Sequence, residues 1–93
     1  MRTIEWTTQF KKDYKREGRG RHMASLDNDL FSVVETLAMD QPLEPKHSDH
    51  SLSGEWKEHR DCHIKPDLVL IYQKPDLENI RLVRLGSHSE LGL

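Results

Sequence analysis

The run Leu68–Tyr72 (Leu-Val-Leu-Ile-Tyr) is apolar at nearly every position and lies between two turn-forming segments, residues 65–67 and 75–78. Such a run is typical of a central β-strand, which we expect at residues 68–74. Further strand patterns lie on both sides of it, at residues 55–64 and 79–86, and the two turns are short enough to make hairpins. We therefore expect the C-terminal half to form a three-stranded antiparallel meander.

The N-terminal half contains one strand pattern and two helix patterns. Residues 2–6 alternate polar with apolar residues, which predicts a short strand. Thr7 is placed to cap a helix that Gly18 would end. A second helix is predicted by apolar residues that recur at intervals of three and four: Met23, Leu26, Leu30, Val33, Val34 and Leu37.

This order of elements predicts the fold class. A chain of 93 residues makes a single domain, residues 1–93. The two helices can bury their apolar sides only against one face of the small antiparallel sheet, so we expect a two-layer α+β fold of order β-α-α-β-β-β with the opposite face open. Pro42 and Pro45 end the second helix, and residues 41–54 should form a long surface connection.

Composition bears on the compartment. Cys62 is the only cysteine, so no internal disulfide can form, and a reducing compartment is expected. The first residues are charged before any apolar run develops, unlike a signal peptide, and no apolar stretch is long enough to span a membrane. We expect a cytoplasmic protein with no membrane partner.

Charge is unevenly divided along the chain. Residues 1–25 hold seven Lys or Arg and three Asp or Glu, whereas residues 26–93 hold seven and thirteen. A basic end of this kind suits a polyanionic partner, although it can equally be the solvated side of an amphipathic helix. The candidate RNA-contacting residues are Lys11, Lys12, Lys15, Arg16, Arg19 and Arg21.

Four of the six histidines lie between positions 47 and 63. A metal site is one interpretation, but His59 and His63 would lie about 13 Å apart in an extended strand, and a single cysteine cannot complete a structural zinc site. We therefore expect no metal and no other cofactor. His22, His47 and His59 are interpreted as solvated surface residues.

A second group of residues can supply acid–base chemistry. The turn after His63 should bring the Asp67 carboxylate near its ring, and a meander can return Arg84 and His88 beside the same hairpin. RNA cleavage through the 2′-hydroxyl needs a base, an acid and a cation at the phosphate, which these residues can provide. Alternatively, Asp67 only caps its turn and Arg84 only neutralises an acidic neighbour.

Several motifs resemble the YafQ-like branch of the RelE/ParE toxins over nearly the whole chain. They are Trp6–Tyr14, Leu52–Gly54, Trp56, Arg60–His63, Pro66–Asp67, Leu70–Tyr72 and Arg84–His88. The resemblance implies a RelE-like fold and a type II toxin that acts as a ribosome-dependent endoribonuclease. It also matches the functional positions of that branch to His50, His63, Asp67 and His88 as catalytic residues and to Arg84 on the phosphate. His50 enters the site through this resemblance alone.

The resemblance further implies partners: a cognate antitoxin in a hetero-oligomeric complex, mRNA on the ribosome, and operator DNA contacted through the antitoxin. The choice between general acid and general base stays open, with His88 favoured as the acid. Two other interpretations remain. One is a non-enzymatic toxin that binds a protein such as gyrase, as in the ParE-like branch, and the other is a metal-binding module.

Overall fold

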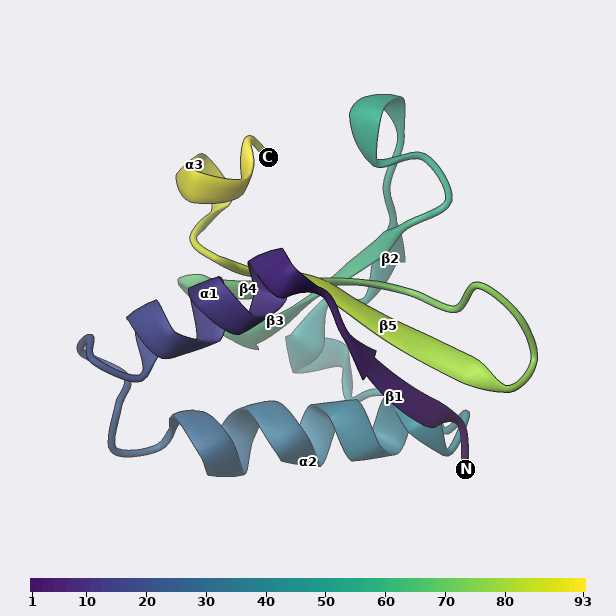
Figure 1. Cartoon of the computed structure of the whole chain (residues 1–93), viewed down its shortest axis with the longest axis horizontal. Helices are drawn as coiled ribbons and strands as arrows, with labels where there is room; N and C mark the ends of the chain where they lie inside the picture. Colours follow the sequence, from purple (N-terminus) through teal and green to yellow (C-terminus); the bar gives the residue numbers. More distant parts are fainter.

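The computed structural model describes residues 1–93 and has one five-stranded sheet with three α-helices (Figure 1). Two single-turn 3₁₀ helices lie in the long connection before the meander, η1 (Pro45–His47) and η2 (Gly54–Trp56). The helices are all too short or too polar to cross a membrane. In chain order the regular elements are β1 (Thr3–Trp6), α1 (Thr8–Glu17), α2 (Leu26–Ala38), β2 (His50–Ser51), β3 (Arg60–Lys65), β4 (Leu68–Gln73), β5 (Asn79–Gly86) and α3 (His88–Leu91).

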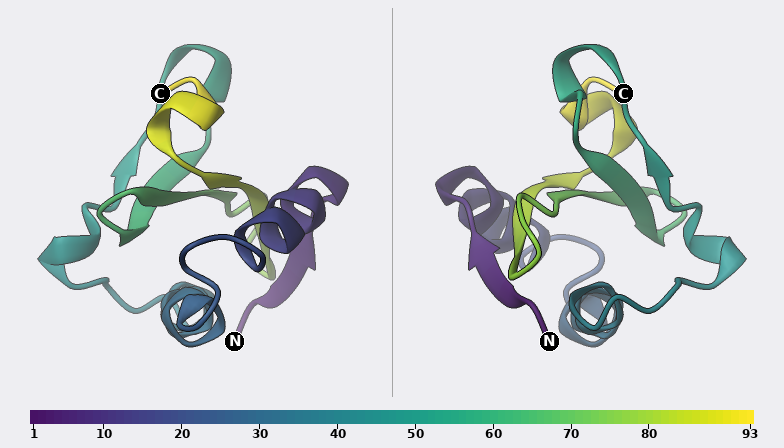
Figure 2. Two further views of the ribbon diagram at one scale, coloured as in Figure 1. Left: turned by 90° about the vertical axis from the view of Figure 1, so that its left-hand side faces the viewer. Right: turned by 90° about the vertical axis from the view of Figure 1, so that its right-hand side faces the viewer.

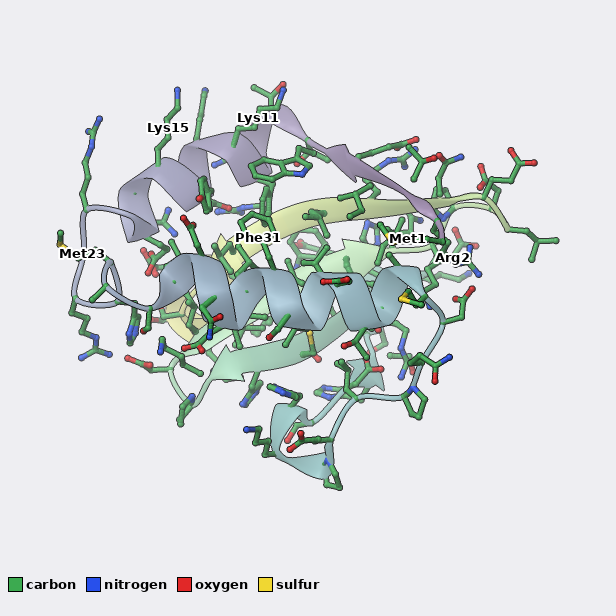
Figure 3. The ribbon with its side chains drawn as sticks, turned by 90° about the horizontal axis from the view of Figure 1, so that it is seen from below. Met1, Arg2, Lys11, Lys15, Met23 and Phe31 are labelled. Carbon is green, nitrogen blue, oxygen red and sulfur yellow. The ribbon has the colours of Figure 1, made fainter.

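The strands lie in the order β1-β5-β4-β3-β2. The meander β3-β4-β5 is antiparallel, as predicted, and β1 joins it as an edge strand that pairs parallel to β5, a direction that the sequence pattern did not specify. The two helices explain this direction. In Figure 3, α1 leads away from the end that holds Met1 and Arg2 to the turn at Met23, and α2 runs back. The meander therefore starts from the same end as β1.

The main core lies between α2 and one face of the sheet, with α1 beside the β1–β5 edge (Figure 2). Thr7 caps α1 as predicted, because its hydroxyl accepts from the Phe10 amide at 3.0 Å. Phe10 and Leu30 are fully buried, and each such side chain contributes about 2 kcal/mol through removal of apolar surface from water. Met23 is 66% exposed because α2 begins only at Leu26, so its assignment to the second helix is wrong.

The opposite face of the sheet is partly covered rather than open. Val69 and Ile71 of β4 pack there against Leu91 of α3, and η2 contributes Trp56. Ser87 and Glu90 form a capping box that starts α3, a helix the sequence analysis did not predict. α3 lies above the sheet on the side away from α2 (Figure 2), and the ring of its first residue, His88, contacts the ring of His63 on β3.

An irregularity in β5 changes which face Arg84 occupies. Tyr72 pairs with Leu82, but the adjacent Ile71 pairs with Arg84, so β5 holds one extra residue at this point. Such a bulge interrupts the strict alternation of side chains. Leu82 and Leu85 both belong to the main core, and Arg84 lies opposite Ile71 on the other face.

Candidate active site

One row of paired residues crosses the face of the sheet away from α2. Asp61 of β3 pairs with Ile71 of β4, and Ile71 pairs with Arg84 of β5. His50 of β2 pairs with Asp61 on its other side. Residues directly opposite one another in a sheet share a face, so the register alone aligns an imidazole, a carboxylate and a guanidinium.

The neighbouring row brings two more imidazoles together. His63 pairs with Val69, and Val69 pairs with Gly86, two residues before His88. The rings of His63 and His88 meet edge to face, with centroids 5.0 Å apart. The prediction that the C-terminal tail returns His88 beside the His63 hairpin is therefore confirmed.

Asp61 lies at the centre of this arrangement and was missed in the sequence analysis. It is only 2% exposed, and its Oδ1 atom lies 3.0 Å from Nε2 of His50. Burial raises the pKa of Asp61, and the charges of His50, His63 and His88 oppose this rise without cancelling it. Period-two alternation along β3 was the available signal, because Asp61 and His63 stand two residues apart and share a face.

The tautomer of the His50 ring follows from its contact with a backbone carbonyl. Its Nδ1 lies 2.8 Å from the Ser48 carbonyl, which can only accept, so Nδ1 carries a proton. In a neutral ring, Nε2 would then carry no proton. It faces Asp61 Oδ1, an oxygen that has no hydrogen-bond donor. Nε2 and Oδ1 face each other at 3.0 Å, so a proton placed between them can be held by either the ring or the carboxyl. His50 and Asp61 are thus suited to exchange a proton.

Three contacts hold the segment that carries His50. The Tyr72 hydroxyl donates to the Asp49 carboxylate at 2.6 Å, and Arg60 Nε donates to the same oxygen at 3.2 Å. Nδ1 of His47 donates to the His63 carbonyl at 2.6 Å. These bonds attach the residues before β2 to β3 and β4. They therefore hold the position of His50 in the site.

Asp67 does not contact His63, and the expectation that it would is wrong. Its carboxylate is paired instead with Arg21 and with His22, whose Nε2 lies 3.1 Å away, in the turn between α1 and α2. The helix connection packs over the β3–β4 turn and supplies these cations, which the local sequence around Asp67 does not reveal. His22 is consequently not the solvated residue that was predicted.

The other two histidines interpreted as solvated are also half-buried. His47 makes the bond to the His63 carbonyl, and the His59 ring lies edge-on against Trp56 with centroids 5.5 Å apart. The His47 contact joins residues 16 positions apart, which local composition could not indicate, whereas the His59 contact is local.

Arg84 is paired with an acidic residue from a distant part of the chain. Its Nε donates to Asp13 Oδ2 at 2.7 Å, and its side chain is 23% exposed. The interpretation of Arg84 as a partner of an acidic neighbour is correct in this respect, but the neighbour lies on α1 rather than in the acidic C-terminal half.

The six candidate RNA-contacting residues divide into two groups. Arg16 donates to the Leu85 carbonyl and pairs with three carboxylates, and Arg21 pairs with Asp67, so both have structural partners. The others are exposed and have no acidic partner: Lys11, Lys12, Lys15 and Arg19. Figure 3 shows Lys11 and Lys15 pointing away from the body of the molecule.

Comparison with known proteins identifies the family. The family model described as the bacterial toxin of type II toxin-antitoxin systems, YafQ, matches residues 2–92. The chain belongs to the YafQ family. It is 37% identical to the mRNA interferase toxin YafQ of Escherichia coli K12 over 93 residues, which cover 98% of this chain and 96% of that one.

Solved structures of related toxins agree with the assignment of this chain to the YafQ family. The YafQ chain of the E. coli DinJ-YafQ complex superposes with a TM-score of 0.81 at 36% identity, covering 98% of both chains. A metal-bound toxin from Helicobacter pylori has the same TM-score at 47% identity, covering 98% of this chain and 99% of the other. The RelE-like α+β fold expected from the sequence is confirmed.

Although the H. pylori toxin binds a metal, the donor groups of this YafQ-family chain do not gather around one point. No three His, Cys, Asp or Glu side chains are placed to share one ion. Cys62 is fully buried on the core face of β3, away from the histidines. The residues do not fit a metal centre of three protein ligands.

Proposed function

We propose that this toxin is an mRNA interferase that cleaves mRNA on the ribosome through the 2′-hydroxyl of the RNA, without a cofactor. One observation carries the proposal: one face of the sheet bears His50 in contact with the buried carboxylate of Asp61, the adjoining rings of His63 and His88, and Arg84. A surface that only binds a protein such as gyrase has no need of this set. The name of the E. coli relative supports the same activity.

The chemistry is a transesterification. The 2′-oxygen attacks the adjacent phosphorus as its proton passes to a base, and the bond from phosphorus to the 5′-oxygen breaks as that oxygen receives a proton. The products are a 2′,3′-cyclic phosphate and a 5′-hydroxyl. His50 and His63 share the role of base, with the pair of His50 and Asp61 accepting the proton. His88 is the acid, because it is exposed at the edge of the site.

Two further residues complete the proposal. Arg84 binds the phosphate and stabilises the charge that develops on the pentacoordinate phosphorus. We assign the orienting role to Asp61 rather than to Asp67, because only Asp61 contacts one of the site histidines. The carboxylate of Asp67 is shared between Arg21 and His22 instead.

The proposal includes partners and location. The solved DinJ-YafQ complex supports a cognate antitoxin for this chain in a hetero-oligomeric complex, which would contact operator DNA through the antitoxin. Lys11, Lys12, Lys15 and Arg19 are proposed to contact ribosomal RNA, because they are exposed and unpaired. Because the proposed substrate is mRNA on the ribosome, the enzyme would act in the cytoplasm.

Replacement of His88 by alanine tests the proposal. We expect H88A to lower the rate of mRNA cleavage in a purified translation system by on the order of a hundredfold, as removal of a general acid does. Its thermal unfolding and antitoxin binding should be unchanged, because the side chain is exposed. His59→Ala is the matched control and should cleave at the wild-type rate. Full cleavage by H88A would remove this residue from the mechanism, and inhibition of gyrase without RNA cleavage would contradict the proposed function.

A further inference from the structure

Asp13 is a buried carboxylate on a helix whose outer side is basic. It is fully buried, and Asp61 is the only other buried charged residue of the chain. A buried carboxylate is costly unless it is paired and hydrogen-bonded. Asp13 pairs with Arg84 but has no role of its own in the proposed transfer of protons.

Three of the hydrogen bonds that Asp13 accepts come from the strand that carries Arg84. Arg84 donates to it twice, from Nε at 2.7 Å and from Nη2 at 3.4 Å, and the Leu85 amide donates at 3.0 Å. Within α1 it also accepts from Arg16 and Gln9. Burial raises the pKa of Asp13, but the hydrogen bonds from Arg84 and Leu85 outweigh this and hold the pKa below its ordinary value.

The contacts leave one part of the Arg84 guanidinium free. Nε and Nη2 form the edge that faces Asp13, and Nη1 has no hydrogen-bond partner in the protein. The bulge in β5 has already brought Arg84 to the face that holds Asp61. Two charge-assisted bonds to one carboxylate fix both the position and the plane of a guanidinium.

We propose that Asp13 is a positioning residue, which holds Arg84 with its free Nη1 toward the phosphate of the substrate. This inference rests on the proposed function, and it adds α1 to the elements that build the active site. Without Asp13, the Arg84 side chain could adopt several rotamers and would spend less time on the phosphate. A small misplacement of such a group is enough to cost a large factor in rate.

A double-mutant cycle separates positioning from a purely structural role. Single-turnover cleavage of a defined mRNA on purified ribosomes is measured for wild type, D13N, R84A and the double variant. We expect D13N to lose about tenfold and R84A about a hundredfold. If Asp13 acts through Arg84, adding D13N to R84A changes the rate by less than about twofold. A full further tenfold loss in the double variant overturns the inference.

Asp29→Asn is the matched control. Asp29 pairs with Lys65 at 2.5 Å and joins α2 to β3, so D29N also breaks an ion pair between a helix and the sheet. If D29N and D13N have equal thermal stability, D29N should still cleave at a rate within about twofold of wild type. A loss in D29N as large as that in D13N would show that any such break impairs the enzyme, and would contradict a specific role for Asp13.

Arg84→Lys decides the question if D13N does not fold. Lysine keeps the positive charge but cannot offer two N–H groups in one plane to Asp13. We expect R84K to lose nearly as much activity as R84A, and activity within about threefold of wild type overturns the inference. If the wild-type chain cleaves RNA, R84A is impaired and D13N cleaves at the wild-type rate, the role of Asp13 is overturned and the proposed function stands. No RNA cleavage by the wild-type chain overturns the proposed function, and the role of Asp13 with it.

Discussion

Two buried carboxylates, Asp13 and Asp61, serve opposite purposes. Asp13 is saturated with donors, and its pKa is lowered. Asp61 has an oxygen without a hydrogen-bond partner, and its pKa is raised. A saturated carboxylate is a fixed anchor, whereas one with a raised pKa and an adjacent imidazole can take part in proton transfer.

Asp61→Asn should separate stability from activity. Burial penalises the ionised form, so the contribution of Asp61 to stability is largest below its ordinary pKa of 3.8 and is lost as the pH rises through the raised value in the folded state. At pH 7 we expect D61N to be more stable by on the order of 1 kcal/mol. Its cleavage rate should fall by on the order of a hundredfold, because the proton acceptor of the His50 pair is removed.

Urea unfolding at pH 3 and pH 7 checks this prediction, since the stability gain should be present only at the higher pH. Asp67→Asn is the comparison for activity. If D67N loses more activity than D61N, the orienting role belongs to Asp67 after all. A stability difference that is the same at both pH values would show that the charge of Asp61 is not the cause.

At the scale of the elements, periodicity predicted what local patterns can determine. The two helices, the antiparallel meander and the cap at Thr7 follow from spacing and capping chemistry, and all are present. The parallel pairing of β1 and the contact of Asp67 with Arg21 depend on how distant segments return, which no local pattern encodes. The bulge in β5 is a feature that a local pattern could have predicted, although the sequence analysis did not use that pattern. The spacing of three between Leu82 and Leu85 in a strand of otherwise alternating core residues was a usable signal for it.

The connection from α2 to β3 illustrates the same limit. Prolines and polar residues predicted a surface segment, yet it contains β2 and is anchored at Asp49. The anchor is a tyrosine hydroxyl from β4, 23 residues away. Tyr72 is 1% exposed. Its ring packs in the core, and its hydroxyl donates the hydrogen bond to Asp49.

Tyr72→Phe tests whether this anchor positions His50. Removal of the hydroxyl leaves the Asp49 carboxylate short of one donor, which should lower the free energy of unfolding by about 1–2 kcal/mol. Amide exchange at residues 48–52 should become faster, and mRNA cleavage should fall severalfold. Tyr14→Phe is the matched control, because its hydroxyl donates to Asp27 and joins α1 to α2. If both variants alter exchange and cleavage equally, the effect does not come from the anchor of His50.

At the scale of the whole molecule, the charges are divided in space as well as along the chain. The unpaired lysines project from α1, whereas the basic residues that pair with carboxylates hold elements together, as Arg16 and Arg84 do. The net charge of −2 therefore hides a basic surface on an acidic body. Such a body is repelled by RNA in most orientations, and the basic surface selects the orientation in which the toxin approaches.

Replacement of Lys11, Lys12 and Lys15 by glutamine should therefore weaken association with the ribosome while leaving the chemical step unchanged. Each phosphate contact releases about one counterion, so the slope of log affinity against log salt should become shallower by about 2 to 3. Filter binding to purified ribosomes over a range of KCl concentrations measures the slope, and single-turnover cleavage at saturating ribosome measures the chemistry. Lys74→Gln is the control, because Lys74 follows β4, is already paired with Asp40 and should not affect the slope. An unchanged slope in the triple variant would mean that α1 is only a solvated surface, and that the charge division serves solubility rather than approach to RNA.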